Sequence, residues 1–105
     1  MIFAFLPLAT SCPYSDGSWV YIRTVSELPS AIVRSMGALA EPGAPFNLTD
    51  VVTPATEHLP FKRLLYARGQ GCGLEITYEQ GGRGYARLKA VFVFENGAWR
   101  KSDPP

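Results

Sequence analysis

The chain has few of the residue types from which catalytic and metal sites are built. Its 105 residues include one histidine, His58, and two cysteines, Cys12 and Cys72, far apart in the sequence. No CxxC pair is present, so zinc binding and dithiol redox catalysis are poorly supported. No glycine-rich segment carries the Lys-Ser or Lys-Thr pair of a phosphate-binding loop. The sequence therefore predicts no metal and no cofactor, and it favours a binding protein over an enzyme.

Charge is also scarce and nearly balanced, with 18% charged residues and a formal net charge of +1. This balance gives no overall reason to expect nucleic acid or an anionic membrane as the partner. Hydrophobic residues make up 47% of the chain, which is typical of a globular domain and not of a disordered one. The charge is unevenly distributed, since residues 60–101 hold eight basic and three acidic side chains. The C-terminal half is therefore basic.

Long hydrophobic runs are absent as well. The first apolar run, residues 2–9, is interrupted by a proline and is too short to span a bilayer. It resembles the apolar half of a secretory signal, and the small residues 9–11 resemble a cleavage site, although no basic residue precedes the run. The alternative is a plain hydrophobic first strand. Residues 1–12 are thus a signal-like segment or a first strand, residues 13–105 are one domain, and a periplasmic or secreted location is favoured over a cytoplasmic one.

The two cysteines have several readings. Cys12 follows small residues, as the lipidated cysteine of a bacterial lipoprotein does, but a leucine is usual where Ala9 stands. Cys72 falls in a predicted strand on its apolar side, where an unpaired cysteine acts as a small hydrophobe. A Cys12–Cys72 disulfide is the third reading, because exported small domains often use one. In the loop-entropy model such a bridge would stabilise the fold by up to ~4 kcal/mol.

The N-terminal half predicts a strand followed by a helix. Residues 18–25 are rich in β-branched and aromatic residues, which is typical of a strand. Ser26 then serves as the expected N-cap of a helix over residues 27–39, with Pro29 tolerated in its first turn. An apolar stripe at helical spacing is expected to face the core: Leu28, Ile32, Val33, Met36 and Leu39. The Pro- and Gly-rich residues 41–45 end the helix.

Residues 46–60 form the least regular stretch of the chain. Loops of this length are uncommon in compact domains and often carry function. The loop contains His58, for which we considered pairing with Cys72 as base and nucleophile, but nothing in the sequence brings the two together. It also contains Asn47-Leu48-Thr49, a formal glycosylation sequon that matters only in a eukaryotic secretory context.

The C-terminal half predicts a four-stranded meander with a period of two. The expected strands are residues 61–68, 72–79, 85–94 and a last strand after the Asn96-Gly97 turn, a strong signal for a type I′ hairpin. If Glu79 pairs with Tyr85, Ile76 lies opposite Leu88 and Glu75 opposite Lys89. We then expect one buried face made of Leu74, Ile76, Leu88, Ala90, Phe92 and Phe94, joined by Leu64 and Tyr66. The opposite, exposed face carries Glu75, Arg87 and Lys89.

These elements predict an α+β fold in which one helix packs on a mainly antiparallel sheet. The order is strand, helix, then four-stranded meander. This order resembles a cystatin-like arrangement, in which a sheet wraps one helix. The resemblance concerns topology alone, because no inhibitor motif is present and a fold does not imply a function.

Binding residues are expected in loops. The loop of residues 80–84 presents Arg83 between glycines, so the expected binding residues are Gly82, Arg83, Gly84, Tyr85, Arg87 and His58. Turn formation is the simpler explanation of the glycines. Glu75 and Glu79 share a strand face, as a glycosidase pair can, but Arg87 and Lys89 are expected to neutralise them. The basic strands also carry tyrosines, of which only Tyr85 is expected to face outward, where it could stack on a base.

Three functional hypotheses follow. The first is a non-catalytic exported or periplasmic domain that binds another protein or a cell-envelope component, because no convergent catalytic groups are found. The second is a cytosolic binding module that uses the basic sheet face, with nucleic acid as the ligand. The third is a small enzyme or ligand carrier with a pocket between helix and sheet. Processing near Cys12 separates the first hypothesis from the second.

Overall fold

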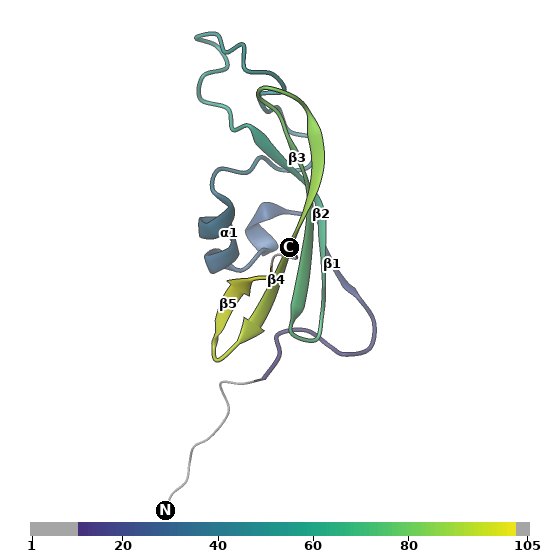
Figure 1. Cartoon of the computed structure of the whole chain (residues 1–105). Helices are drawn as coiled ribbons and strands as arrows, with labels where there is room; N and C mark the ends of the chain where they lie inside the picture. The colour runs from purple at the N-terminus through teal and green to yellow at the C-terminus, as the bar shows by residue number, and fades with distance from the viewer. Residues whose placement is uncertain (1–10, 103–105) are drawn as a thin grey trace, which may run out of the picture.

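A computed structural model describes residues 11–102 of the chain. One short helix and a five-stranded antiparallel sheet make up the regular structure, so the predicted α+β class is confirmed (Figure 1). The expected signal-like run, residues 2–9, lies outside the described residues. In chain order the elements are β1 (Val20–Ile22), the 3-10 turn η2 (Val25–Glu27), α1 (Ser30–Met36), β2 (Lys62–Gln70), β3 (Gly73–Gln80), β4 (Ala86–Glu95) and β5 (Ala98–Lys101).

The strands lie in the sheet in their order along the chain, β1 to β5, each antiparallel to the next. Between β3 and β4, Gln80 pairs with Ala86 and Ile76 with Ala90, so the predicted pairing of Ile76 with Leu88 is wrong by two residues. The reason is that Tyr85 stays in the loop and does not begin the strand. A shift of two residues keeps every side chain on its predicted face. The assignment of β3 and β4 side chains to the two faces of the sheet is therefore correct although the pairing is not.

A bulge in β2 changes the face of its side chains. The pairing with β3 shifts between Leu64 and Tyr66, which places Leu65 as an extra residue. Beyond the bulge Ala67 is fully buried, whereas Tyr66 turns to the opposite side and lies 6.1 Å from Tyr21 between ring centroids. The expectation that Tyr66 shares the buried face with Leu64 is therefore wrong.

The helix is shorter than predicted and begins later. Leu28 is extended, with φ −75° and ψ 147°, because a residue that precedes proline avoids the helical region. The predicted helix is thus divided at Pro29 into η2 and α1, and Ser26 caps neither of them. Gly37, at φ 82°, ends α1 before Leu39. The apolar stripe still faces inward: Leu28, Ile32 and Met36 are buried, and Val33 and Leu39 are partly buried.

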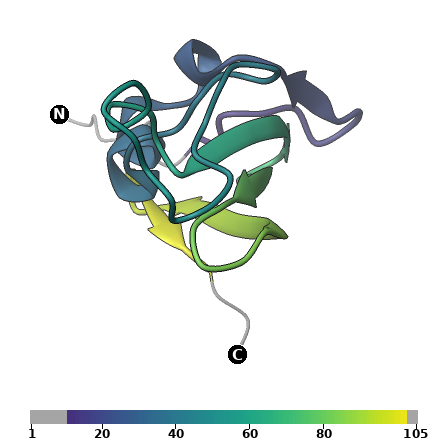
Figure 2. The same cartoon turned by 90° about the horizontal axis from the view of Figure 1, so that it is seen from above.

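The core lies between α1 and the face of the sheet that carries Ile76, here called the helix face (Figures 1 and 2). Its buried residues are Ile22, Leu28, Ile32, Met36, Leu64, Ala67, Leu74, Ile76, Ala90 and Phe92. Leu88 was predicted to belong to this set, but 38% of it is exposed. At Leu88, β4 is the edge of the sheet, since β5 pairs only with residues 92–95. Phe94 is only partly buried.

The last hairpin forms as predicted. Asn96 and Gly97 both have positive φ, 56° and 78°, as a type I′ turn requires, and Phe94 pairs with Trp99. Their rings meet edge to face with centroids 5.3 Å apart. The turn between β2 and β3 consists of Gly71 and Cys72, so Cys72 does not lie in a strand.

A disulfide joins Cys12 to Cys72, with Cα atoms 4.6 Å apart. Backbone hydrogen bonds from Tyr14 to Gly71 and from Gly71 to Ser15 fasten the same segments together. The ring of Tyr14 lies where a side chain at residue 69 would lie, so only glycine fits there. We call this part of the molecule, residues 12–17 with the turn 71–72, the disulfide end. No helix within residues 11–102 is long and apolar enough to cross a membrane.

Candidate functional site

A groove of about 570 Å³ lies at the opposite end of the sheet from the disulfide. We call this part, residues 41–60 together with 81–85, the loop end. The groove lies on the outer face of the sheet, opposite the helix face. It is lined by Pro45, Phe46, Leu48, Arg63, Glu79 and Tyr85. The groove therefore combines apolar walls from two loops with an ion pair from two strands.

The long loop is held in place by backbone contacts and by Asn47. The side-chain amide of Asn47, which is only 5% exposed, donates to the carbonyls of Thr56 and Leu59, both at 2.9 Å. Its backbone N–H donates to the Pro60 carbonyl at 2.7 Å. The side-chain amide that glycosylation would modify is thus buried and hydrogen-bonded. Asn47 therefore has a structural role, because it holds the long loop in its conformation.

The loop crosses from the helix to the outer face along the edge of β2. Ala40 pairs with Arg63 beside β2, and the segment that follows then lies over the outer face. Farther along, Gly82 donates its N–H to the Leu48 carbonyl at 3.2 Å. A side chain at Gly81 would collide with the backbone of Asn47 and Leu48. The glycine between β3 and β4 is therefore needed for loop packing as well as for the turn.

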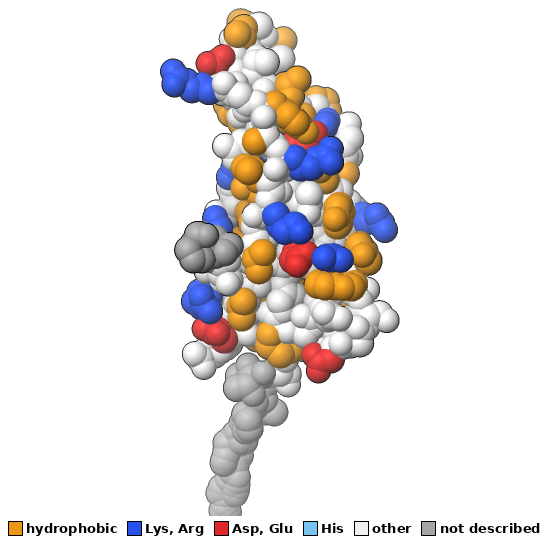
Figure 3. Space-filling model, turned by 45° about the vertical axis from the view of Figure 1, so that its right-hand side comes forward, with side chains coloured by type: hydrophobic (Ala, Val, Ile, Leu, Met, Phe, Trp, Pro, Cys, Tyr) orange, Lys and Arg blue, Asp and Glu red, His pale blue; other side chains and the backbone are white. Residues whose placement is uncertain are grey.

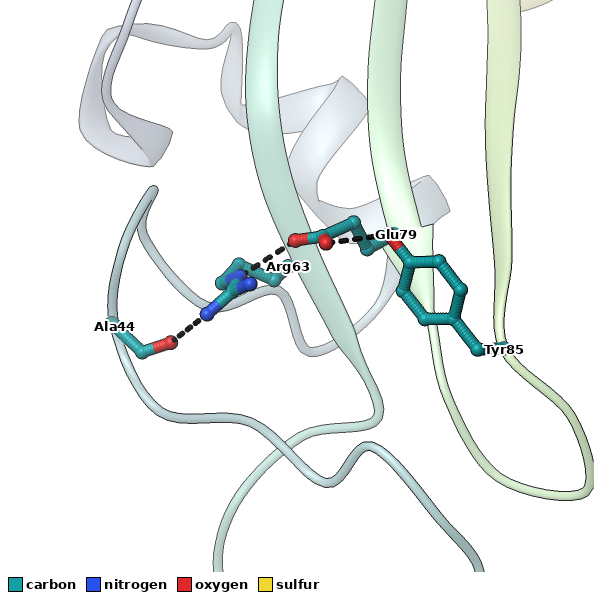
Figure 4. Close-up of polar contacts among 4 residues, drawn as sticks. All are labelled: Ala44, Arg63, Glu79 and Tyr85. Atoms are coloured by element: carbon teal, nitrogen blue, oxygen red, sulfur yellow. Dashed lines mark hydrogen bonds and ion pairs between the residues drawn. The ribbon is translucent and has the colours of Figure 1, made fainter.

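Under this loop, Glu79 connects three segments of the chain (Figure 4). One carboxylate oxygen accepts a hydrogen bond from Arg63 Nε at 2.7 Å, and the other accepts one from the Tyr85 hydroxyl at 2.6 Å. Arg63 Nη1 in turn donates to the Ala44 carbonyl at 3.0 Å, and its guanidinium lies 4.3 Å from the centre of the Phe46 ring. Glu79 is only 6% exposed, whereas Tyr85 is 50% exposed and the Arg63 side chain 25%, so a buried carboxylate is held by two partners that reach the surface.

The electrostatics of this chain follow from its hydrogen bonds. The bond from Arg63, followed by the bond from Tyr85, lowers the pKa of Glu79, and these effects outweigh its burial. The bond to the Glu79 carboxylate raises the pKa of Tyr85. Glu79 therefore stays ionised with both oxygens occupied. Such a carboxylate organises the groove and is poorly suited to accept a proton from a substrate.

Exposed apolar side chains gather around the loop end. Eight large hydrophobic residues of the described chain are exposed, and four of them belong to the loop end: Leu48, Val51, Val52 and Tyr85. Phe61 directly precedes β2, and Leu88 lies on β4. Figure 3 shows apolar side chains on the surface of this end. Val51 is the most exposed, at 74%. Clusters of this kind mark interaction surfaces more often than scattered single residues do.

The structure brings together only part of the predicted binding set. Tyr85 lines the groove, and Gly82 bridges to Thr49. Arg83, Gly84 and Arg87 are exposed, and none of them lines the groove. His58 is exposed in the long loop, far from Cys72, whose sulfur is in the disulfide. The two cannot act as a base and nucleophile pair.

The two glutamates of the considered glycosidase pair serve separate ion pairs. Glu75 accepts from Arg68 Nε at 3.0 Å and lies 3.7 Å from Lys89 Nζ. Glu79 is paired with Arg63, and not with Arg87 or Lys89, which were expected to neutralise it. Each carboxylate is thus paired with different basic side chains, so the arrangement does not support a catalytic pair.

Sequence reasoning missed Arg63, Phe46 and Leu48 as parts of the site. Arg63 stands directly across from Glu79 in the sheet, so a correct pairing of β2 with β3 would have found it. Phe46 and Leu48 have no comparable pattern in the sequence. Their position beside the sheet depends on the hydrogen bonds of the buried Asn47 amide.

The chain matches no protein-family model, no curated protein and no solved structure. The similarity of the predicted element order to a cystatin-like arrangement therefore stays a prediction. Within residues 11–102 no three His, Cys, Asp or Glu side chains are grouped as a metal site requires.

Proposed function

We propose that the chain is an exported, non-catalytic domain that binds another protein through its loop end. The observation that carries the proposal is the groove itself, in which two of the apolar lining residues, Leu48 and Tyr85, are exposed, at 51% and 50%. The ion pair of the buried Glu79 with the partly buried Arg63 lines the groove and gives it a defined shape. Aromatic and apolar anchors beside Arg are typical of protein interfaces.

The Cys12–Cys72 disulfide supports the location outside the cytoplasm, since such bonds persist in oxidising compartments. A cysteine in a disulfide has no thiol left to carry a lipid, which speaks against the lipoprotein reading. The signal-like character of residues 2–9 points in the same direction.

Binding is favoured over catalysis because the polar groups of the groove satisfy one another. Glu79 is held by Arg63 and Tyr85, and Arg63 by Glu79 and the Ala44 carbonyl. The groove is lined by no residue of α1, so it is not the pocket between helix and sheet that the third hypothesis requires. The cystatin-like order remains a proposal about topology and implies no inhibitor role.

Photocrosslinking in the cells that make the protein tests this proposal. We would place a benzoylphenylalanine at Leu48, which is 51% exposed and lines the groove, and in a matched variant at Tyr21, which is 48% exposed on β1. The expected result is a defined protein adduct from position 48 alone. Equal adducts from both positions, or no protein adduct from position 48, would contradict the proposal.

One observation favours the nucleic-acid hypothesis as the second candidate. The β2 bulge turns Tyr66 outward beside Tyr21, and Arg68 lies 3.9 Å from the centre of the Trp19 ring. Stacked aromatics beside cations bind single-stranded nucleic acid. Here Arg68 is already paired with Glu75, and the disulfide speaks against a cytosolic location. A nucleic-acid adduct from position 21 in the same crosslinking experiment would raise this candidate above the first.

A further inference from the structure

The first half of β4 has no strand on its outer side within the described chain. β3 pairs with β4 over residues 86–93, whereas β5 pairs only with residues 92–95. No backbone hydrogen bond from elsewhere in residues 11–102 reaches residues 86–90. We call residues 86–90 of β4 the open edge.

The backbone groups that point outward from this edge belong to Arg87 and Lys89. Phe94 donates its N–H to Cys72, on the β3 side, whereas the Val91 carbonyl accepts from Ser102, on the β5 side. Residues two apart in an antiparallel strand point the same way. The N–H and C=O groups of Arg87 and Lys89 therefore face away from β3. They form a template of the kind that a partner strand uses.

The side chains of the same two residues determine which strand fits. Across the outer face, Arg63, Glu79 and Arg87 stand in one row of the sheet, so the charges alternate from plus to minus to plus. Arg87 forms no ion pair with any residue from 11 to 102, and it is exposed. An acidic side chain on an added strand would continue the alternation. Lys89, two residues farther along, lies 3.7 Å from Glu75 and is 52% exposed at its side chain, so it can also contact a second acid on the added strand.

Between Arg87 and Lys89, the side chain of Leu88 lies on the helix face and offers an apolar contact to an added strand. Leu88 is 38% exposed and ends a row that begins with the buried Leu64 and passes through Tyr78. An apolar side chain between the two acids would cover Leu88. Pairing with a second copy of this chain is disfavoured, because an antiparallel pairing centred on Leu88 would place Arg87 against Lys89.

We propose that the open edge binds an extended acidic segment of a partner protein, which adds to the sheet as a strand beside β4. The segment alternates acidic residues, opposite Arg87 and Lys89, with an apolar residue over Leu88. This inference rests on the proposed protein-binding function and supplies its mode of recognition. The open edge begins at Ala86, next to Tyr85 of the groove, so the two surfaces are continuous.

The test uses the purified, oxidised protein and a short synthetic peptide in which glutamate alternates with valine. We expect binding by fluorescence anisotropy, together with slower amide hydrogen exchange at Arg87 and Lys89. The double variant Arg87→Glu/Lys89→Glu should weaken binding by at least about tenfold. It should also bind a lysine–valine peptide that the wild type does not bind. Arg34→Glu, at an exposed position on α1, is the matched control and should change affinity by less than about twofold.

A peptide N-methylated on the residues that face β4 keeps its charges and tests the ladder without changing the protein. Full binding of this peptide, or unchanged exchange at Arg87 and Lys89, would overturn the strand addition. Preferential binding of a single-stranded oligonucleotide at the same residues would overturn the choice of partner. If the peptide fails while the crosslink from Leu48 persists, the recognition mode is wrong and the protein-binding function stands. If the crosslink fails as well, both are wrong.

Discussion

The disulfide end and the loop end of the sheet are built from the same alternation of apolar and polar residues, yet they differ in what covers them. Toward the disulfide end, Phe92 and Leu74 pack in one core with residues of α1, β5 continues the sheet beside β4, and both side chains are almost fully buried. Toward the loop end, β4 runs past the last residue of β5, and Leu88 on the same face is 38% exposed. On the outer face the loop end is the covered part, because the loop of residues 41–60 lies beside Glu79, which is buried.

Alternation thus assigns a side chain to a face of the sheet, whereas coverage by other segments decides whether that side chain is buried. Apolar residues left uncovered at the loop end are available to a partner. Substitutions at covered and uncovered positions should therefore differ in their effect on stability.

Truncation of Phe92 to alanine should destabilise the fold by ~3–5 kcal/mol, because it leaves a cavity in a packed core. Leu88→Ala, on the same strand and face, is the matched control and should cost under about 1 kcal/mol, because this side chain is already partly in water. Denaturant unfolding of both variants measures the difference. Equal losses would mean that coverage does not distinguish the two ends.

Replacement of Cys12 and Cys72 by serine should cost roughly 2–4 kcal/mol, since the bond constrains the unfolded chain. The bridged residues are 60 positions apart, which makes the closed loop long. Thermal unfolding of the wild type with and without reductant should show a loss similar to that of the double variant. An unchanged midpoint under reduction would show that the bond does not stabilise the disulfide end.

Gly81→Ala should cost ~1–3 kcal/mol by overpacking, because the new methyl group meets the carbonyls of Asn47 and Leu48. Gly84→Ala in the same loop has open space around it and should change stability by less than about 0.5 kcal/mol. Chemical denaturation separates the two variants. If both behave alike, the long loop does not pack on Gly81.

Glu79→Gln should weaken the dependence of stability on pH. The pKa of Glu79 is lowered in the folded protein, so its contribution is complete above its ordinary value of 4.5 and is lost as the pH falls through the folded-state pKa. The stability difference between wild type and variant should therefore shrink on acidification below that value. Glu95→Gln, at the exposed pair with Arg100, should show a smaller and more salt-sensitive difference.

Arg83→Ala should leave stability within about 0.5 kcal/mol of the wild type, as expected for an exposed residue. If Arg83 contributes to binding, the same change should weaken the protein adduct formed from position 48. An unchanged adduct, together with a lost adduct after substitution within residues 41–60, would assign recognition to the long loop alone.

The candidate site was harder to predict than the strands that carry it. The even-numbered face of β3, with Leu74 and Ile76, was predictable because alternation is local. The ion pair of Glu79 with Arg63 was not, because the pairing of β2 depends on a bulge at Leu65. The burial of Glu79 was not either, because it depends on a loop from a distant part of the chain.

The sequence by itself determined the features that depend on near neighbours. These are the class of fold, the inward stripe from Leu28 to Met36, and the Asn96-Gly97 hairpin, whose two residues adopt positive φ. Side-chain chemistry and spacing are sufficient for each. Tertiary contacts were needed to turn Tyr66 outward, to bury Glu79 and to leave residues 86–90 without a neighbouring strand among residues 11–102. Each of these results from contacts between segments far apart in the chain, for which no local pattern exists.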